Sequence, residues 1–511
     1  MTPPRIVALA ASGVLFVTAS ILIPLAFAAP QSLPKATRTE RVYAASQPFE
    51  DRFQQLTSPS CGAASCHGGG AVGKKGSEQT TWAPDLLGKG PSDPHARAFQ
   101  VLSNETSVRI AKALGYTHPA SQEPLCLKCH SVPGAVGGNT SCEIGCTPTS
   151  STSQPVPSEG VGCGGCHGPA EKWIGPHTLA TWKTLSNREK WEQYGFVPGN
   201  DLVARNLTCV KCHIGDAERE VNHDLIAAGH PRLAFESARF HFHPTYRKHW
   251  TEKGNVADFE LRTWFIGQIV GWRASAELVR VRAERAVRKQ TPWPEFSSFG
   301  CFSCHKTVPA DESAGLATRF ESQKPRLGLA PWEEWSLANF AAVESLRGEV
   351  YPDAALPELK ELLNLRALME TKSPKPREVA VQAAKAVTEI DGWLTAVQSA
   401  RDSGKTATPS ANLPRKLIHR IAELASLESD WDAFATAYLG CAAGYHAAGG
   451  KARAPSWSEP IRELETLLLF PKAKGKITYD SPADFGPTKA ALIRKQFRAL
   501  ADATAESRSQ P

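Results

Sequence analysis

Cysteine pairs followed directly by a histidine recur along the first 305 residues of the chain. The pattern Cys-x-x-Cys-His occurs four times, at 126–130, 163–167, 209–213 and 301–305, and a looser copy with four residues between the cysteines stands at 61–67. In this pattern two sulfurs can add to the two vinyl groups of one haem, and the adjacent histidine ligates the iron. The motifs therefore predict haem c, about five per chain.

Zinc is the alternative, because paired Cys-x-x-Cys units also form four-cysteine zinc sites. Such sites need no histidine after every second cysteine, and all four pairs here have one. Haem is therefore favoured, although the sequence leaves open whether the first copy attaches through both cysteines or through the second alone. The predicted haem-binding residues are Cys61, Cys66, His67, Cys126, Cys129, His130, Cys163, Cys166, His167, Cys209, Cys212, His213, Cys301, Cys304 and His305.

The ligand on the far side of each iron decides what that iron can do. The only methionines, Met1 and Met369, lie outside the motif region, so methionine is nearly excluded there. Histidine is then expected on both sides of most irons. Eight histidines between residues 45 and 310 lie outside the motifs, and three of them, at 241, 243 and 249, are left unassigned. The expected distal ligands are His95, His118, His177, His223 and His230.

Helices are expected to position these groups. Asp93 and Pro94 predict a helix start that places His95 in a first turn. His223 and His230, seven residues apart, could share one helix face. Apolar residues at helical spacing predict a long helix over 257–288, with Trp264 and Trp272 as core residues rather than electron relays. Further helical runs are expected near 331–350, 355–371, 375–400, 414–447, 458–470 and 487–505.

The predicted fold class is mainly α, with little regular sheet. A haem region over 51–310 is followed by an all-helical domain over 311–511. Residues 6–27 form an apolar run after Arg5 that ends in an Ala-x-Ala pattern, so 1–28 reads as a signal peptide or an anchor, with a polar leader over 29–50. Both readings place the protein in the periplasm or otherwise outside the cytoplasm.

The three cysteines outside the motifs have other expected roles. Cys142 and Cys146 are close enough in sequence for a small-loop disulfide in an oxidising compartment, and a decayed haem motif is the alternative. Cys441 lies in an apolar helical stretch and is expected to be a buried thiol.

Charge identifies no partner. The formal net charge is +7, but the propionates of five haems would add about ten negative charges. Lysine and arginine are dispersed, and no nucleic-acid module is present.

The chain resembles the cytochrome c-554-like multihaem family. The likeness rests on Asp-Pro-His-Ala-Arg-Ala at 93–98, on motifs two to four, and on the glycine-rich stretch 160–169. The resemblance implies periplasmic electron transfer through packed haems, most of them ligated by two histidines. It also implies distal roles for His95 and His177. In the family the haem of the second motif, here that of His130, can lack a distal ligand. The widened first motif, the fifth motif and the long helical tail depart from the family.

Two functions are expected from these features. The first is an electron carrier that works with redox partner proteins, including a membrane-bound electron-transfer complex on which the helical domain could dock. The alternative is a multihaem oxidoreductase in which one open iron acts on a small nitrogen or sulfur compound. A small-molecule substrate is expected only if one iron is open.

Overall fold

The computed structural model describes residues 53–83, 93–132, 159–242, 256–301, 329–354, 356–404, 409–450, 455–468, 472–473, 476–477 and 485–505. Helices dominate these residues, so the predicted mainly α class is confirmed. The described strands are β1 (Lys472–Ala473) and β2 (Lys476–Ile477), an antiparallel pair. No helix in the described part of the chain is long and apolar enough to cross a membrane. The apolar run 6–27 and the pair Cys142 and Cys146 lie outside the described residues.

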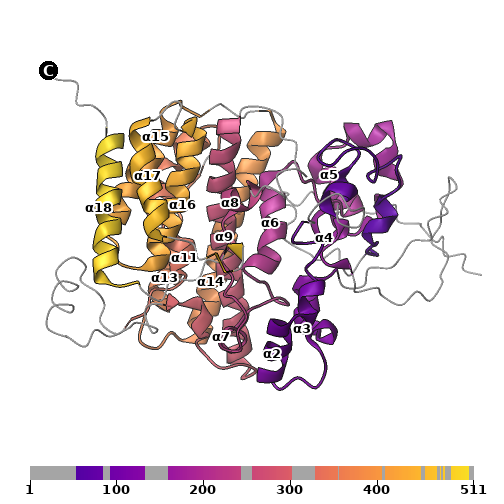
Figure 1. Cartoon of the computed structure of the whole chain (residues 1–511), viewed down its shortest axis with the longest axis horizontal. Helices are drawn as coiled ribbons and strands as arrows, with labels where there is room; N and C mark the ends of the chain where they lie inside the picture. Colours follow the sequence, from indigo (N-terminus) through magenta and orange to yellow (C-terminus); the bar gives the residue numbers. More distant parts are fainter. Residues whose placement is uncertain are drawn as a thin grey trace, which may run out of the picture. The chain divides into compact units, whose positions relative to one another are not determined.

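Short elements make up the part of the chain that carries the first four motifs (Figure 1). Three of them, α3, α4 and α6, end at a motif histidine, which puts both cysteines and the histidine on one side of a helical turn. The α-helices of this part are α1 (Glu78–Trp82), α2 (Glu105–Ala113), α3 (Pro124–His130), α4 (Cys163–His167), α5 (Asn187–Tyr194), α6 (Leu202–His213), α7 (His223–Ala227) and α8 (Ser237–His241). The 3-10 helices are η2 (Ser58–Cys61), η4 (Gln100–Ser103), η5 (Ala120–Gln122), η7 (Ala170–Lys172), η8 (Pro176–Thr178), η9 (Ala180–Thr184) and η11 (Phe296–Ser298).

The long helix predicted over 257–288 is confirmed as α9 (Val256–Val287). Trp264 and Trp272 are completely buried on it, as expected for core residues. Helix α9 packs against α6 and α8 of the motif region and against α14 and α16 of the later helices. It therefore joins the motif-bearing segments to the helices that follow.

The later helices are α11 (Glu334–Leu337), α12 (Phe340–Val350), α13 (Lys360–Met369), α14 (Pro376–Asp402), α15 (Leu413–Ala425), α16 (Trp431–Ala447), α17 (Pro455–Leu468) and α18 (Pro487–Thr504). The run expected over 414–447 is two helices, because Asp430 caps the second one by accepting a hydrogen bond from the Asp432 amide. Cys441 is fully buried, as predicted. One hydrophobic core contains residues from Val203 to Ala501. The domain boundary expected near residue 310 lies outside the described residues.

Candidate haem sites

Three pairs of histidine rings face each other within the described residues. The ring centroids are 6.2 Å apart for His67 and His177, 6.0 Å for His95 and His213, and 6.4 Å for His130 and His230. Each pair joins a motif histidine to one of the expected distal histidines. Two imidazoles that bind one metal from opposite sides, with metal–nitrogen bonds of about 2 Å, have centroids roughly 6.3 Å apart. The spacing of all three pairs fits two axial ligands of one haem iron.

Hydrogen bonds at Nδ1 orient five of these six rings. In each, Nδ1–H donates to a carboxylate or a backbone carbonyl, so that Nε2 is left to bind a metal; such partners fix the orientation of metal-ligating histidines. The acceptors are Glu78 Oε2 at 2.8 Å for His67, Asp93 Oδ1 at 2.8 Å for His95, the Ala98 carbonyl at 2.8 Å for His130, the Ile174 carbonyl at 2.6 Å for His177 and the Pro231 carbonyl at 2.7 Å for His230.

Burial keeps several of these imidazoles neutral, which is the form that binds a metal. Burial lowers the pKa of His213 to about 3, and it also lowers the pKa of His130 and His230. At His95 burial acts in the same direction, but the hydrogen bond and charge of Asp93 outweigh it and raise the pKa. Asp93 thus polarises the His95 ring, as carboxylates do when they accept a hydrogen bond from the free ring nitrogen of a metal-ligating histidine.

The segment around His95 differs from the predicted helix start. Residues 94–99 form successive turns closed by bonds such as Ala98 N–H to the His95 carbonyl at 3.1 Å, and η4 begins only at Gln100. The physical reason is that Asp93 Oδ1 accepts from both the amide and the ring of His95, which fixes a tight local turn. Gly160 lies against this turn at φ +73°, where a Cβ atom would approach the His95 carbonyl oxygen to 2.4 Å. The stretch before the third motif therefore needs glycine there.

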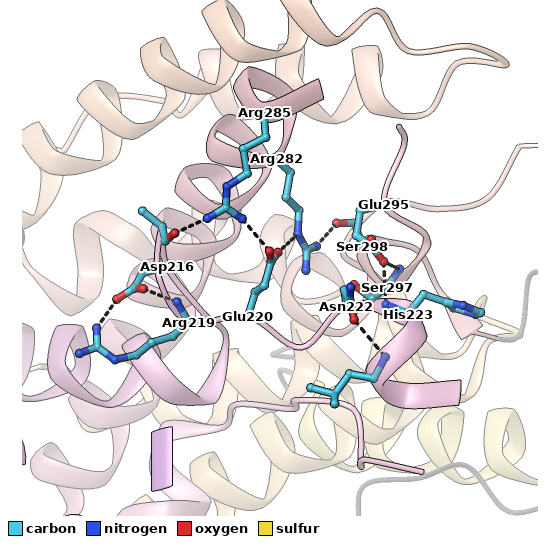
Figure 2. Close-up of polar contacts among 12 residues, drawn as sticks. Asp216, Arg219, Glu220, Asn222, His223, Arg282, Arg285, Glu295, Ser297 and Ser298 are labelled. Atoms are coloured by element: carbon cyan, nitrogen blue, oxygen red, sulfur yellow. Dashed lines mark hydrogen bonds and ion pairs between the residues drawn. The ribbon is translucent and has the colours of Figure 1, made fainter. Parts of the chain in front are cut away.

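His223 and His230 do not share a helix face, so that prediction is wrong. Helix α7 begins at His223 and ends at Ala227, and Gly229 at φ +112° turns the chain before His230. His230 faces His130, whereas the His223 ring lies 6.0 Å from Phe296, in the segment that leads to the fifth motif. The backbone N–H of His223 donates to Glu295 Oε1 at 2.8 Å (Figure 2).

An ionic network joins the segment after the fourth motif to α9 (Figure 2). Glu220 accepts from Arg282 at 2.9 Å and from Arg285 at 2.6 Å, and Arg282 also donates to Ser298 Oγ at 2.7 Å. Arg219 pairs with Asp216 at 2.8 Å and donates to the Lys128 carbonyl, inside the second motif, at 2.9 Å. Motifs two and four and the approach to motif five are thereby held together. Sequence reasoning missed this network, although Arg282 and Arg285 stand three residues apart on a predicted helix.

Cysteines of different motifs lie side by side. A hydrogen bond between Cys61 and Cys163 raises the pKa of the first thiol and lowers that of the second, and the pair Cys129 and Cys212 behaves in the same way. Burial, followed by the influence of Cys209, raises the pKa of the Cys166 thiol. The first motif is thus next to the third, the third next to the fourth, and the fourth next to the second.

The other expected ligands are placed differently. The His167 ring lies 5.7 Å from the Phe196 ring, and Val197 N–H donates to the His167 carbonyl at 3.0 Å. The side chain of His118 is 54% exposed, and its Nδ1 is 3.8 Å from Glu123 Oε2, too far for the hydrogen bond that the paired rings make. Its assignment stays a prediction. Cys304 and His305 lie outside the described residues.

One histidine that the sequence reading left unassigned has the hydrogen bond typical of a ligand. His241 is buried, and its Nδ1–H donates to the Ser237 carbonyl at 2.7 Å. Burial lowers its pKa to about 3. The sequence does not reveal this hydrogen bond. Its acceptor is the backbone carbonyl four residues earlier, and every histidine inside a helix has such a carbonyl.

A comparison with known families adds one finding. Residues 91–168 match the family of cytochrome c554 and c-prime. The resemblance seen in the sequence is confirmed over this segment, which holds His95 and motifs two and three. Over this segment the chain is thus similar to c-type cytochromes, a likeness that implies covalently bound haem c. Neither the curated proteins nor the solved structures gave a match to this chain.

Proposed function

We propose that the chain is an exported multihaem cytochrome that moves electrons along five covalently attached haems. The observation that carries this proposal is the set of three opposed histidine pairs with centroids 6.0–6.4 Å apart. An iron with a histidine on each side has no free coordination position, so it exchanges electrons and does not bind a substrate.

The pair at the second motif bears most strongly on the choice between a carrier and an enzyme. The family resemblance allows the iron of the His130 haem to lack a distal ligand. In this chain His230 occupies the opposite side, and the Pro231 carbonyl orients its ring through Nδ1. This arrangement supports a distal role for His230, which would occupy the position at which a substrate would be expected to bind.

Contacts between motifs support a continuous path for electrons. The neighbouring cysteines support an order of the attached haems that runs first, third, fourth and second. The fifth motif joins this order through Cys301, whose sulfur lies 3.7 Å from Arg232, two residues after His230. Neighbouring haems attached at such sulfurs lie close together, as a chain of electron transfers needs.

We assign His223 to the fifth-motif haem. Glu295 Oε1 accepts from the His223 amide at 2.8 Å and from the Ser297 amide at 3.1 Å, four residues before Cys301. One carboxylate thus fixes the start of α7 to the approach of the fifth motif. His223 is then available to the iron that His305 ligates.

Mass spectrometry and carbon monoxide binding test the proposal together. The exported protein should carry five haem additions, and the reduced protein should show no change in its Soret band under carbon monoxide. Four haem additions would mean that the first motif does not bind a haem. A carbon monoxide complex in one fifth of the haem would favour the alternative, an oxidoreductase with an open iron. The redox partner, a soluble protein or a membrane-bound complex, is a separate question that cross-linking can address.

A further inference from the structure

Arg232 lies between the fifth haem motif and the start of α16. Its Nη1 donates to Asp432 Oδ2 at 2.6 Å and its Nη2 to Asp432 Oδ1 at 2.5 Å, a two-point contact. The same Nη1 lies 3.7 Å from the sulfur of Cys301. The guanidinium therefore contacts both a haem-attachment residue and a carboxylate of the C-terminal helices.

The surroundings hold this charge in place. The side chains of Arg232 and Asp432 are 13% and 2% exposed, so water screens the pair weakly. The guanidinium lies over the Trp335 ring, 5.5 Å from its centroid. Planar stacking and a two-point carboxylate contact together leave the guanidinium little freedom to move away from Cys301.

The electrostatic effect of the pair at Cys301 is unequal. Arg232 Nη1 is within 3.7 Å of the Cys301 sulfur, so the cation is the charge in contact with it. In agreement, burial raises the pKa of the Cys301 thiol, Arg232 lowers it through its charge and hydrogen bond, and Asp432 and Asp430 raise it by less than Arg232 lowers it. Although the pair is formally neutral, the positive end acts more strongly at the sulfur. A net positive field near an iron disfavours the ferric state and raises its reduction potential.

We propose that Arg232 raises the reduction potential of the fifth-motif haem, and that Asp432 on α16 holds Arg232 in position and partly compensates its charge. This rests on the proposed function, because it assumes a haem at Cys301. It also gives the C-terminal helices a role in the electron path: they supply the anion that sets the field at one haem.

Charge-changing variants test this role by potentiometric titration of the haem bands. Asp432→Asn removes the carboxylate that pairs with the cation, so one component should shift to higher potential. Arg232→Gln removes the cation, so the same component should shift to lower potential. The double variant should lie closer to the wild type than either single one, and Arg232→Lys, which keeps the charge, should move the component least. Replacement of the motif histidine, His305→Met, identifies which component belongs to the fifth motif.

Asp391→Asn is the matched control. Asp391 pairs with Arg273 between α14 and α9, at 2.5 and 3.1 Å, in another Arg–Asp contact that reaches the later helices. This control should leave all potentials unchanged. Unchanged potentials in both Asp432→Asn and Arg232→Gln, with five haems and low-spin irons retained, would overturn the inference alone. A shift in a component other than that of the fifth motif would overturn it too, whereas a missing fifth haem in the wild type would overturn the proposed function.

Discussion

His230 lies opposite His130, with ring centroids 6.4 Å apart and ring planes at 89°. His130 belongs to the second motif, whose iron the family resemblance leaves open. The His230 ring is oriented from behind by the Pro231 carbonyl, 2.7 Å from Nδ1. A single substitution, at His230, can therefore test whether the haem of the second motif has a distal histidine, as an electron carrier requires.

Replacing His230 with alanine should convert one of five irons from low spin to high spin. The haem should stay attached, because both thioethers at Cys126 and Cys129 remain. Electron paramagnetic resonance and a cyanide titration would measure the change, with about one equivalent of cyanide bound per chain. His419→Ala is the control, since that ring lies on α15 and its Nδ1–H donates to the Ala501 carbonyl at 3.0 Å, away from the expected ligands. An unchanged spectrum in His230→Ala would contradict the assignment.

Asp93 is expected to matter for both the stability of the fold and the fourth haem. Its Oδ1 accepts from the amide and the ring of His95, and the residue is 3% exposed. Asp93→Ala should lower the free energy of unfolding by about 2 kcal/mol, because hydrogen bonds to a buried charged group are lost. It should also raise one reduction potential, since the His95 ring becomes a weaker donor to iron. Denaturant unfolding and a redox titration measure the two effects, and Asp93→Asn should restore part of both.

The network of Figure 2 predicts a stability effect without a change in iron ligands. Glu220 pairs with Arg282 and Arg285, and the Arg282 side chain is 6% exposed. Glu220→Ala removes the carboxylate partner of the buried Arg282 guanidinium and should cost on the order of 3 kcal/mol. Glu277→Ala on α9 is the control. It removes the partner of Arg280, whose side chain is 27% exposed, and should cost less than about 1 kcal/mol. Equal losses in the two variants, measured by chemical unfolding, would contradict the role of the network.

Stability should depend on pH through Glu236. Burial raises the pKa of this carboxyl to about 7, against the opposing hydrogen bonds from the amides of Arg239 and Ala238. The folded state therefore holds a proton that the unfolded state releases near its usual pKa of about 4.3. Glu236 therefore contributes fully to the free energy of unfolding below a pH of about 4.3. This contribution, up to about 3 kcal/mol, is lost as the pH rises to about 7 and above. Glu236→Gln should flatten the unfolding free energy between pH 5 and 8, and an unchanged slope would exclude this cause.

Sequence reasoning reached the parts of the fold that depend on local pattern. The long helix α9 and its buried Trp264 and Trp272 follow from apolar residues at helical spacing over nine turns. The motifs, and His95, His177 and His230 as partners, follow from residue type and number. Which distal histidine meets which motif could not be predicted, because the pairing is tertiary: the two members of each pair are 100 to 118 residues apart.

The misplaced features have local physical causes. Gly229 ends the turn after α7 with a backbone conformation that separates His223 from His230. Asp430 starts a new helix within a continuous apolar run. His118 and His241 look alike in sequence, yet only His241 has an acceptor at Nδ1 within hydrogen-bond distance. Such acceptors are backbone carbonyls positioned by the fold, and residue type does not reveal them.

Electron paramagnetic resonance of the oxidised wild-type protein tests the central claim most directly. Ligation by two histidines at each of the five haems, with one of the remaining histidines opposite His167, predicts only low-spin ferric signals, which integrate to five irons per chain. Addition of cyanide or nitric oxide should leave these signals unchanged. A high-spin ferric signal that integrates to one iron and disappears on addition of either ligand would show an open site and contradict the account.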